Sequence, residues 1–340
     1  MSYYRLIRQL LFQLEPESAH HLALNTLNLA HRLGISKLFQ TKPRAPLTVM
    51  GLAFANPIGL AAGFDRNGEY IDALARLGFG FIEVGTVLPR AHQGHSKPRL
   101  FRLVREEALI NRIGLPSKGL DYVVTQLNKM RYRGILGINI GKQKETDNLA
   151  AIDDFQLGFR TFWPYASYIS INISSPNMVG LRDLQDPDLL NPLLQGLKET
   201  QRQIHELYGK YVPLVIKISP DQSLSALDSL IEALLAHQVD GVIAANTTID
   251  RSLVATSPFA FEAGGLSGKP LQQSHFSIIA HLARKLQNKI PIIASGGIMD
   301  ASSADQALHA GASLLQVYTG LIYQGPGLVK QLVTQLSQPK

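Results

Sequence analysis

Short apolar segments alternate with stretches of helical periodicity along most of the chain. The apolar segments are rich in β-branched residues, and we expect strands at residues 57–62, 80–86, 135–141, 168–174, 213–219, 240–247, 291–297 and 313–319. Helical patterns occupy most of the intervals, as at residues 69–77, 187–207, 223–237 and 271–288. Near-continuous apolar strands separated by helices are typical of a parallel sheet, and eight such units predict an α/β fold, a closed (β/α)8 or TIM barrel.

Two intervals, at residues 88–116 and 248–270, are longer than a simple crossover. Long loops in a compact domain are usually functional. Both follow predicted strands, so we expect them on the face where such barrels carry their active sites.

Two amphipathic helices are expected ahead of the barrel, at residues 4–14 and 16–33. Pro16 suits a helix start and Gly34 a helix end. One face of the first helix carries Tyr4, Ile7, Leu10, Leu11 and Leu14. A proline-containing linker at residues 41–46 predicts a division into a helical segment, 1–40, and a barrel, 41–340.

Composition narrows the chemistry. The 340 residues include no cysteine, which excludes disulfides, thiolate metal ligands and a cysteine base. Residues 1–44 hold six basic and two acidic side chains, so more than half of the net charge of +7 lies there. No apolar run is long enough to span a bilayer, and the start of the chain lacks the features of a cleaved signal peptide.

Polar residues or glycines close every predicted strand. Clustered at one rim of a barrel, such groups can face a ligand, and we expect a binding site there. Gly296-Gly297 and Tyr318-Thr319 follow the last two strands, where barrels commonly hold a phosphate group. Lys217 interrupts an apolar strand, which favours a fixed positive charge beside an anionic group over a core ion pair.

The segment from Asn172 to Asn177 is the most specific one. With Asn111 and Asn246, its two asparagines would offer four amides to a planar ligand such as a pyrimidine. Ser175 lies between them as a candidate base. No Asp or His in the segment completes a conventional triad, which argues against a hydrolase.

Several motifs together resemble the dihydroorotate dehydrogenases, specifically the membrane-associated class 2 enzymes. They are AAGFDRNGE at 61–69, EVGTV at 83–87, NRIG at 111–114, INISSPN at 171–177, KISPD at 217–221, NTT at 246–248, GGLSG at 264–268, SGGI at 295–298 and QVYTG at 316–320. Class 1 relatives use a cysteine base and lack the N-terminal helices, so the absence of cysteine and the presence of the helices both favour class 2.

The resemblance implies oxidation of dihydroorotate to orotate with FMN, in pyrimidine biosynthesis. It implies Ser175 as the base that removes the C5 proton while C6 delivers hydride to flavin N5, and it implies no metal. The implied FMN contacts are Ala62, Gly63, Arg66, Thr86, Asn139, Asn172, Lys217, Ala245, Gly268, Gly297, Tyr318 and Thr319. The implied substrate contacts are Arg66, Asn111, Arg112, Ile113, Gly114, Leu115, Asn172, Asn177, Asn246 and Thr247.

The resemblance also gives the N-terminal helices a role. They would rest on the cytoplasmic face of the inner membrane, bind anionic lipid and form a passage for a membrane quinone. Interfacial Tyr3 and Tyr4 and the basic excess fit this role. The alternative is that the helices cap the bottom of the barrel. We expect a monomer without a nucleic-acid partner.

The chain departs from the family pattern at Arg66 (usually Lys), Leu115-Pro116 (usually Phe-Asn), Met178 (usually Thr) and Ala245 (usually Thr). In class 2 relatives the phenylalanine and threonine help to carry the proton away from the serine. We therefore expect slower or differently routed deprotonation here. Two alternatives are another FMN barrel acting on a pyrimidine-like ring, as in the dihydrouridine synthases, and a catalytically impaired flavin-binding relative.

Overall fold

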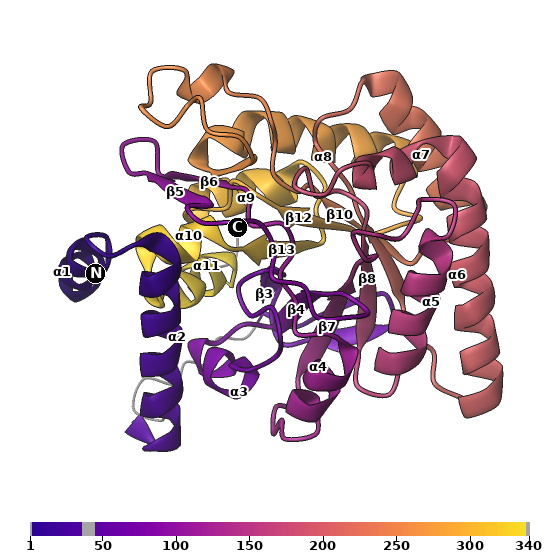
Figure 1. The fold of residues 1–340 in the computed structure, drawn as a ribbon, viewed down its shortest axis with the longest axis horizontal. Coiled ribbons are helices and arrows are strands. Elements are labelled where there is room, and N and C mark those ends of the chain that lie inside the picture. Colours follow the sequence, from indigo (N-terminus) through magenta and orange to yellow (C-terminus); the bar gives the residue numbers. More distant parts are fainter. Residues whose placement is uncertain (1, 36–44, 338–340) are drawn as a thin grey trace.

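The fold is a closed barrel of eight parallel strands surrounded by helices, in a computed structural model that describes residues 2–35 and 45–337, with side chains from Tyr4 onward (Figure 1). The barrel strands are β3 (Ile58–Leu60), β4 (Phe81–Val87), β7 (Ile135–Ile140), β8 (Tyr168–Asn172), β9 (Leu214–Lys217), β10 (Gly241–Ala244), β12 (Ile292–Ser295) and β13 (Leu314–Val317). All eight lie within or one residue beyond the predicted ranges. The TIM-barrel prediction is confirmed.

Each barrel strand pairs in parallel with its neighbours in the sequence, and β13 closes the barrel against β3. The register sets Asn172 of β8 beside Lys217 of β9, and Lys217 beside Ile243 of β10. Parallel strands end at the same rim, so the polar residues that close them meet at one mouth.

Helices form the outer layer of the barrel. They are α3 (Ile71–Leu74), α4 (Leu120–Leu127), α5 (Ala151–Phe162), α6 (Pro187–Tyr208), α7 (Leu224–Ala236), α8 (Gln272–Leu286), α9 (Ala301–His309), α10 (Thr319–Gln324) and α11 (Gly327–Leu336). Short 3-10 helices occur at Ala75–Leu77, Leu181–Gln185, Ser252–Val254 and Lys269–Leu271. In α6 the Asp186 side chain accepts from the Asp188 N–H at the start, and Gly209 ends the helix with a left-handed φ of 68°.

A hairpin closes the N-terminal end of the barrel. Its strands, β1 (Leu47–Val49) and β2 (Leu52–Phe54), were not predicted because each is only three residues long. Val49 and Phe54 of the hairpin pack on the first buried residues of the barrel strands, among them Phe81, Tyr168 and Val215. The hairpin therefore covers the bottom of the barrel.

The two long intervals contain a second sheet, so treating them as loops alone was wrong. Strands β5 (Leu100–Leu103), β6 (Ala108–Asn111) and β11 (Gly265–Gly268) form an antiparallel sheet in the order β11-β6-β5. The pairing sets Asn111 opposite Gly265, which joins the two intervals over the mouth.

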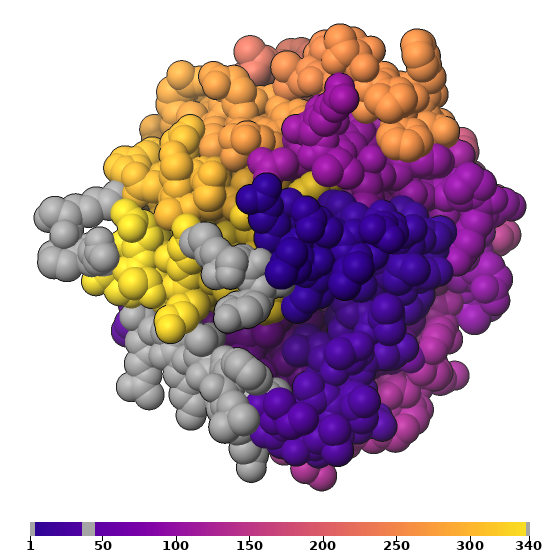
Figure 2. Space-filling view, turned by 90° about the vertical axis from the view of Figure 1, so that its left-hand side faces the viewer, coloured from indigo at the N-terminus to yellow at the C-terminus, as the bar shows by residue number. Residues whose placement is uncertain are grey.

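The N-terminal helices are α1 (Ser2–Leu11) and α2 (Pro16–Arg32), close to the predicted ranges. They lie against the yellow C-terminal helices and the purple part of the chain (Figure 2). The Tyr4 hydroxyl donates to the Ile322 carbonyl over 2.7 Å, and Arg102 of β5 donates to the Phe12 carbonyl over 2.8 Å. Because α10 and β5 both follow the C-terminal ends of barrel strands, the helices lie beside the mouth. The alternative that they cap the bottom is wrong.

The predicted linker at residues 41–44 and the Tyr3 side chain lie outside the described residues. The division at residues 40 and 41 stays a prediction. Among the residues that the structure does describe, no helix combines the length and apolarity needed to cross a membrane.

Candidate active site

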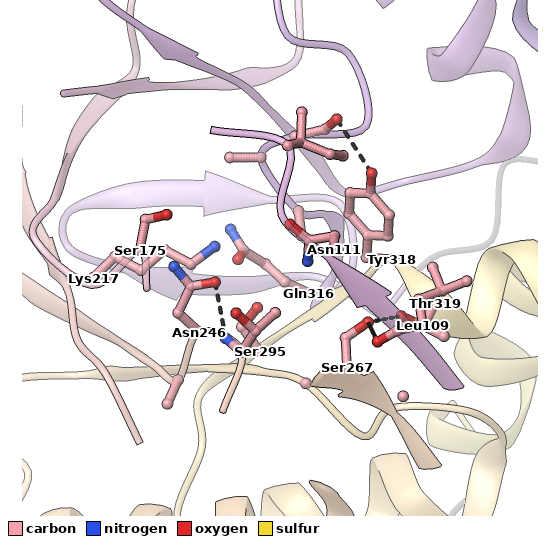
Figure 3. A pocket seen from close by; sticks show the side chains of 18 of the residues that line it. Leu109, Asn111, Ser175, Lys217, Asn246, Ser267, Ser295, Gln316, Tyr318 and Thr319 are labelled. Carbon is pink, nitrogen blue, oxygen red and sulfur yellow. Dashed lines mark hydrogen bonds between the residues drawn. The ribbon is translucent and has the colours of Figure 1, made fainter. Parts of the chain in front are cut away.

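A cavity opens at the C-terminal mouth of the barrel, beneath the β5–β6–β11 sheet (Figure 3). In this view Ser175, Lys217 and Asn246 lie on one side, with Gln316 between them and Asn111. The cavity is lined by these sequence-predicted residues: Ala62, Gly63, Arg66, Thr86, Asn111, Ile113, Gly114, Leu115, Asn172, Ser175, Asn177, Lys217, Ala245, Asn246, Thr247, Gly268, Gly297, Tyr318 and Thr319.

Two residues predicted as ligand contacts are not among those that line the cavity. Asn139 is fully buried beneath the wall, where its amide bonds to Thr86 and Glu83. Arg112 forms an ion pair with Glu262 and lies over the Phe101 ring, with its guanidinium carbon 4.6 Å from the ring centroid. Both side chains bond to neighbouring protein groups, and their contacts with FMN and substrate stay predictions.

Glycines with left-handed backbone form one end of the cavity. Gly268 has a φ of 106°, and a Cβ there would lie 2.4 Å from the Glu107 carbonyl oxygen. A Cβ on Gly297 would lie 3.0 Å from the Gln272 backbone. Ser267 and Thr319 join their hydroxyls over 2.9 Å at the same end. Close backbone approach and hydroxyl donors are what a phosphate group needs.

Lys217 supplies the fixed cation of the site. Its side chain is 6% exposed, and among the described residues it forms no ion pair within 4 Å. The alternative interpretation, that Lys217 belongs to an ion pair in the core, is therefore wrong for the described residues. Burial lowers the pKa of the Lys217 ammonium, and the carboxylate of Glu83 acts in the opposite direction. The ammonium can thus stabilise negative charge on a bound ring.

The four asparagine amides converge from three segments of the chain, since Asn172 and Asn177 share one. The Asn177 amide nitrogen donates to the Asn111 amide oxygen over 3.0 Å, across the mouth. Asn246 donates to the Ser174 hydroxyl over 3.0 Å. These bonds fix the orientation of amides that line the cavity.

Ser175 begins the loop after β8 and is 3% exposed. Its hydroxyl oxygen accepts from the Asn177 backbone N–H over 3.3 Å. No His or Asp hydrogen-bonds to it in the described chain, and no group of His, Asp or Glu side chains there could hold a metal ion. The Ser175 hydroxyl is therefore buried and does not belong to a conventional catalytic triad.

The departures from the family pattern differ in position. Arg66, Leu115 and Ala245 line the cavity, and Leu115 has a φ of 51°, which is unusual for a non-glycine residue. Met178 is 5% exposed and packs in the main hydrophobic core, away from the cavity lining. Burial raises the pKa of the Tyr318 hydroxyl, and the charge of Arg66 acts against that rise.

Sequence reasoning missed two polar residues of the barrel interior. Glu83 of β4 is fully buried, and Gln316 of β13 is 1% exposed and lines the cavity. Both interrupt apolar strands, which is the signal that singled out Lys217. Applied to every strand, that signal would have found them.

The two ends of the cavity fit the two parts of a phosphate-bearing flavin, its ring and its phosphate. The Gln316 amide oxygen is buried without a partner in the described chain, which leaves an acceptor for a ring N–H. Lys217 faces the same space. Gly268 and Gly297, where a phosphate group would fit, lie at the other end of the cavity.

Comparisons with known proteins agree with this geometry. The profile of the family described as dihydroorotate dehydrogenase matches residues 45–339. A protein of Nitrosospira multiformis named dihydroorotate dehydrogenase (quinone) is 51% identical over 333 residues, covering 98% of this chain and 95% of that protein. A protein of the same name from Marinobacter nauticus is 49% identical and covers 97% of each chain.

Solved structures show the same likeness. A crystal structure of DHODH in complex with ferulenol, from Eimeria tenella, superposes with a TM-score of 0.86 at 34% identity, covering 95% of this chain and 90% of that one. The match of family profile, full-length relatives and fold shows that this chain belongs to the dihydroorotate dehydrogenase family.

Proposed function

We propose that the chain oxidises (S)-dihydroorotate to orotate, with FMN as the hydride acceptor and a membrane quinone as the final electron acceptor. One observation carries the proposal: a single cavity brings Ser175 together with four asparagine amides and Lys217. The relatives named dihydroorotate dehydrogenase (quinone) support the same activity and argue against a dihydrouridine synthase-like reaction.

The substrate ring would be held by Asn111, Asn172, Asn177 and Asn246, whose amides match the alternating N–H and C=O groups of a pyrimidine. Arg66, at the cavity edge, would bind the substrate carboxylate, which guanidinium can do with two parallel hydrogen bonds. Holding the ring in this way sets the substrate C5 proton against Ser175.

Ser175 would take the C5 proton. Its oxygen already accepts one backbone N–H, which stabilises developing negative charge on it. Because Met178 packs into the core and Leu115 is apolar, no side-chain hydroxyl at these two positions receives the proton. We infer that water carries it away.

FMN would be held with its phosphate at Gly268, Gly297 and Thr319, and with its ring between Ala62, Gly63 and Lys217. Bound there, FMN supplies the two-electron chemistry that accepts hydride from the substrate. Lys217 would stabilise the added negative charge.

A quinone passage would lie between the N-terminal helices and the barrel. The His20 ring of α2 meets the Phe64 ring edge-on with centroids 4.9 Å apart, and Phe64 meets Tyr318 at 5.3 Å. Burial lowers the pKa of His20 to about 4, so the ring is neutral near pH 7. These contacts connect α2 to the cavity wall.

The outer face of the two helices would rest on a membrane. Apolar side chains there are exposed to solvent, among them Leu6 (62%), Leu10 (68%) and Leu29 (57%). Exposed apolar residues with basic neighbours favour binding to anionic lipid. We propose a monomer at the cytoplasmic face of the inner membrane, without a nucleic-acid partner.

Steady-state turnover tests the choice of electron acceptor. Orotate formation from dihydroorotate should be fast with a soluble quinone and negligible with NAD+ or fumarate. Sedimentation with vesicles, with and without anionic lipid, tests the membrane face; a protein that stays in the supernatant with both would contradict that part of the proposal.

A further inference from the structure

Glu83 is a fully buried carboxylate inside the barrel, directly beneath the cavity. It accepts four hydrogen bonds, from Tyr168 (2.7 Å) and Gln316 (2.7 Å) on one oxygen and from Asn139 (3.1 Å) and Ser170 (3.0 Å) on the other. All four donors are neutral. Among the described residues no cation lies within 4 Å of this carboxylate.

Such an arrangement needs an explanation, because an unpaired buried charge is costly. Hydrogen bonds from four neutral donors offset part of that cost. The nearby cation is Lys217, whose pKa the Glu83 charge raises against the effect of burial. Lys217 lines the cavity (Figure 3), whereas Glu83 is not among the residues that line it.

The orientation of Gln316 follows from Glu83. A carboxylate accepts hydrogen bonds and donates none, so the amide nitrogen of Gln316 must face it. The amide oxygen is then left buried without a partner in the described chain. Gln316 lines the cavity, so a molecule bound there can supply the donor that this oxygen lacks.

A chain of hydrogen bonds is oriented by the same carboxylate. Asn139 must point its nitrogen at Glu83, so its oxygen accepts from the Thr86 hydroxyl over 2.6 Å. The Thr86 oxygen in turn accepts from the Asn172 amide over 2.8 Å. From donor to acceptor the whole chain runs through Asn246, Ser174, Asn172, Thr86, Asn139 and Glu83.

We propose that Glu83 is a positioning residue of the flavin site, whose acceptor-only carboxylate decides which amide groups of Gln316 and, through Asn139, of Asn172 and Asn246 face the cavity. The inference rests on the proposed function, since the cavity must hold a flavin. It deepens that function by naming a residue that touches neither substrate nor cofactor and acts through those that do.

The substitution Glu83→Gln tests this with nearly the same shape. One oxygen position becomes an NH2 group, which must face the NH2 group of either Asn139 or Gln316. One of these amides then has to turn. Turning Gln316 removes the acceptor from the cavity, and turning Asn139 reverses the chain toward Asn246. Either way the pattern offered to the flavin changes.

We expect Glu83→Gln to bind FMN about tenfold more weakly, which is the size of effect of a mismatched buried hydrogen bond. The midpoint potential of the bound flavin should shift as well. Tyr168→Phe is the matched control, because it removes one buried hydrogen bond to Glu83 and leaves the carboxylate acceptor-only. It should change the melting temperature and leave FMN affinity and potential at the wild-type values.

The measurements are FMN release from the holoenzyme, followed by FMN fluorescence, and the flavin potential by equilibration with reference dyes. Wild-type affinity and potential in a folded Glu83→Gln variant would overturn the inference. Equal changes in Glu83→Gln and Tyr168→Phe would also overturn it, because a purely structural role gives that result. If Glu83→Gln does not fold, Gln316→Met takes its place: unchanged FMN affinity there contradicts the assignment of the Gln316 oxygen as an acceptor for the bound flavin.

Failure of the proposed function gives a different result. In that case the wild-type protein does not retain FMN, or dihydroorotate does not reduce it. Both outcomes are visible before any variant is made.

Discussion

The attachment of α2 to the barrel depends on a buried ion pair. Removing this ion pair should impair turnover with quinone and leave flavin reduction by dihydroorotate nearly unchanged. Glu17 is 3% exposed and accepts from the Nε and Nη2 atoms of Arg99 over 3.0 and 2.9 Å. Replacing one partner of such a pair costs about 3–5 kcal/mol. In Glu17→Ala, Arg99 keeps its bonds to the Gln93 and His95 carbonyls, so we expect about 3 kcal/mol, at the low end.

This loss should be local, because the barrel has a core of its own and α2 lies at its side. Three kcal/mol corresponds to about a hundredfold faster hydrogen exchange of the α2 amides. Flavin reduction by dihydroorotate should stay within about twofold of wild type, whereas turnover with quinone falls about tenfold or more.

The matched control is Glu199→Ala, which removes an ion pair whose side chains are 46% and 56% exposed. Pairs of this kind contribute about 0–1 kcal/mol, so α2 exchange and both half-reactions should not change. Unchanged α2 exchange in Glu17→Ala would refute the assignment of this pair as the anchor. An equal loss of both half-reactions would refute the separation of roles.

Three further predictions concern the site itself. Ser175→Ala should slow flavin reduction about 10²–10⁴-fold, while orotate should still bind within about threefold of the wild-type affinity. Stopped-flow absorbance measures the rate of flavin reduction, and titration with orotate measures the affinity. A wild-type rate of reduction would exclude Ser175 as the base. Leu115→Phe combined with Met178→Thr should speed flavin reduction if proton removal is slow in this chain, and no change in the rate would show that it is not. Asp65 is buried, and burial raises its pKa to about 6 from an ordinary value near 3.8. Because the pKa of Asp65 is higher in the folded than in the unfolded protein, the protonated carboxyl stabilises the fold below the unfolded pKa, and this stabilisation is lost as the pH rises toward 6. The melting temperature of wild type relative to Asp65→Asn should therefore fall between pH 4 and pH 6.5. A difference in melting temperature that stays constant with pH would contradict the raised pKa.

The barrel could be predicted from the sequence because its strands are buried on both faces and read as apolar runs. The strands of the upper sheet could not. β5 has alternate residues half-buried and buried, and β11 is glycine-rich, so neither carries a strong apolar signal. β5 pairs with the adjacent β6, and β11 pairs with β6 across about 150 residues of chain, as between Asn111 and Gly265, which no local pattern reports.

The candidate site could be predicted where a residue type is chemically unusual for its place, as for Lys217 and Ser175. Position relative to the cavity could not be predicted. Asn139 and Arg112 belong to matching motifs, yet one is bonded beneath the wall and the other pairs with Glu262. Whether such a residue faces the cavity depends on its side-chain partners in three dimensions. The partners of Glu83 likewise give it a proposed role that its motif does not suggest.

Anaerobic reduction of the bound flavin tests the central claim most directly. The holoenzyme is mixed with dihydroorotate in the absence of oxygen and quinone, and the flavin absorption band is followed. We predict rapid loss of the band, with orotate formed in an amount equal to the flavin reduced. A band that persists while FMN is demonstrably bound would contradict the account, because it would mean that the cavity holds the cofactor and does not oxidise this substrate.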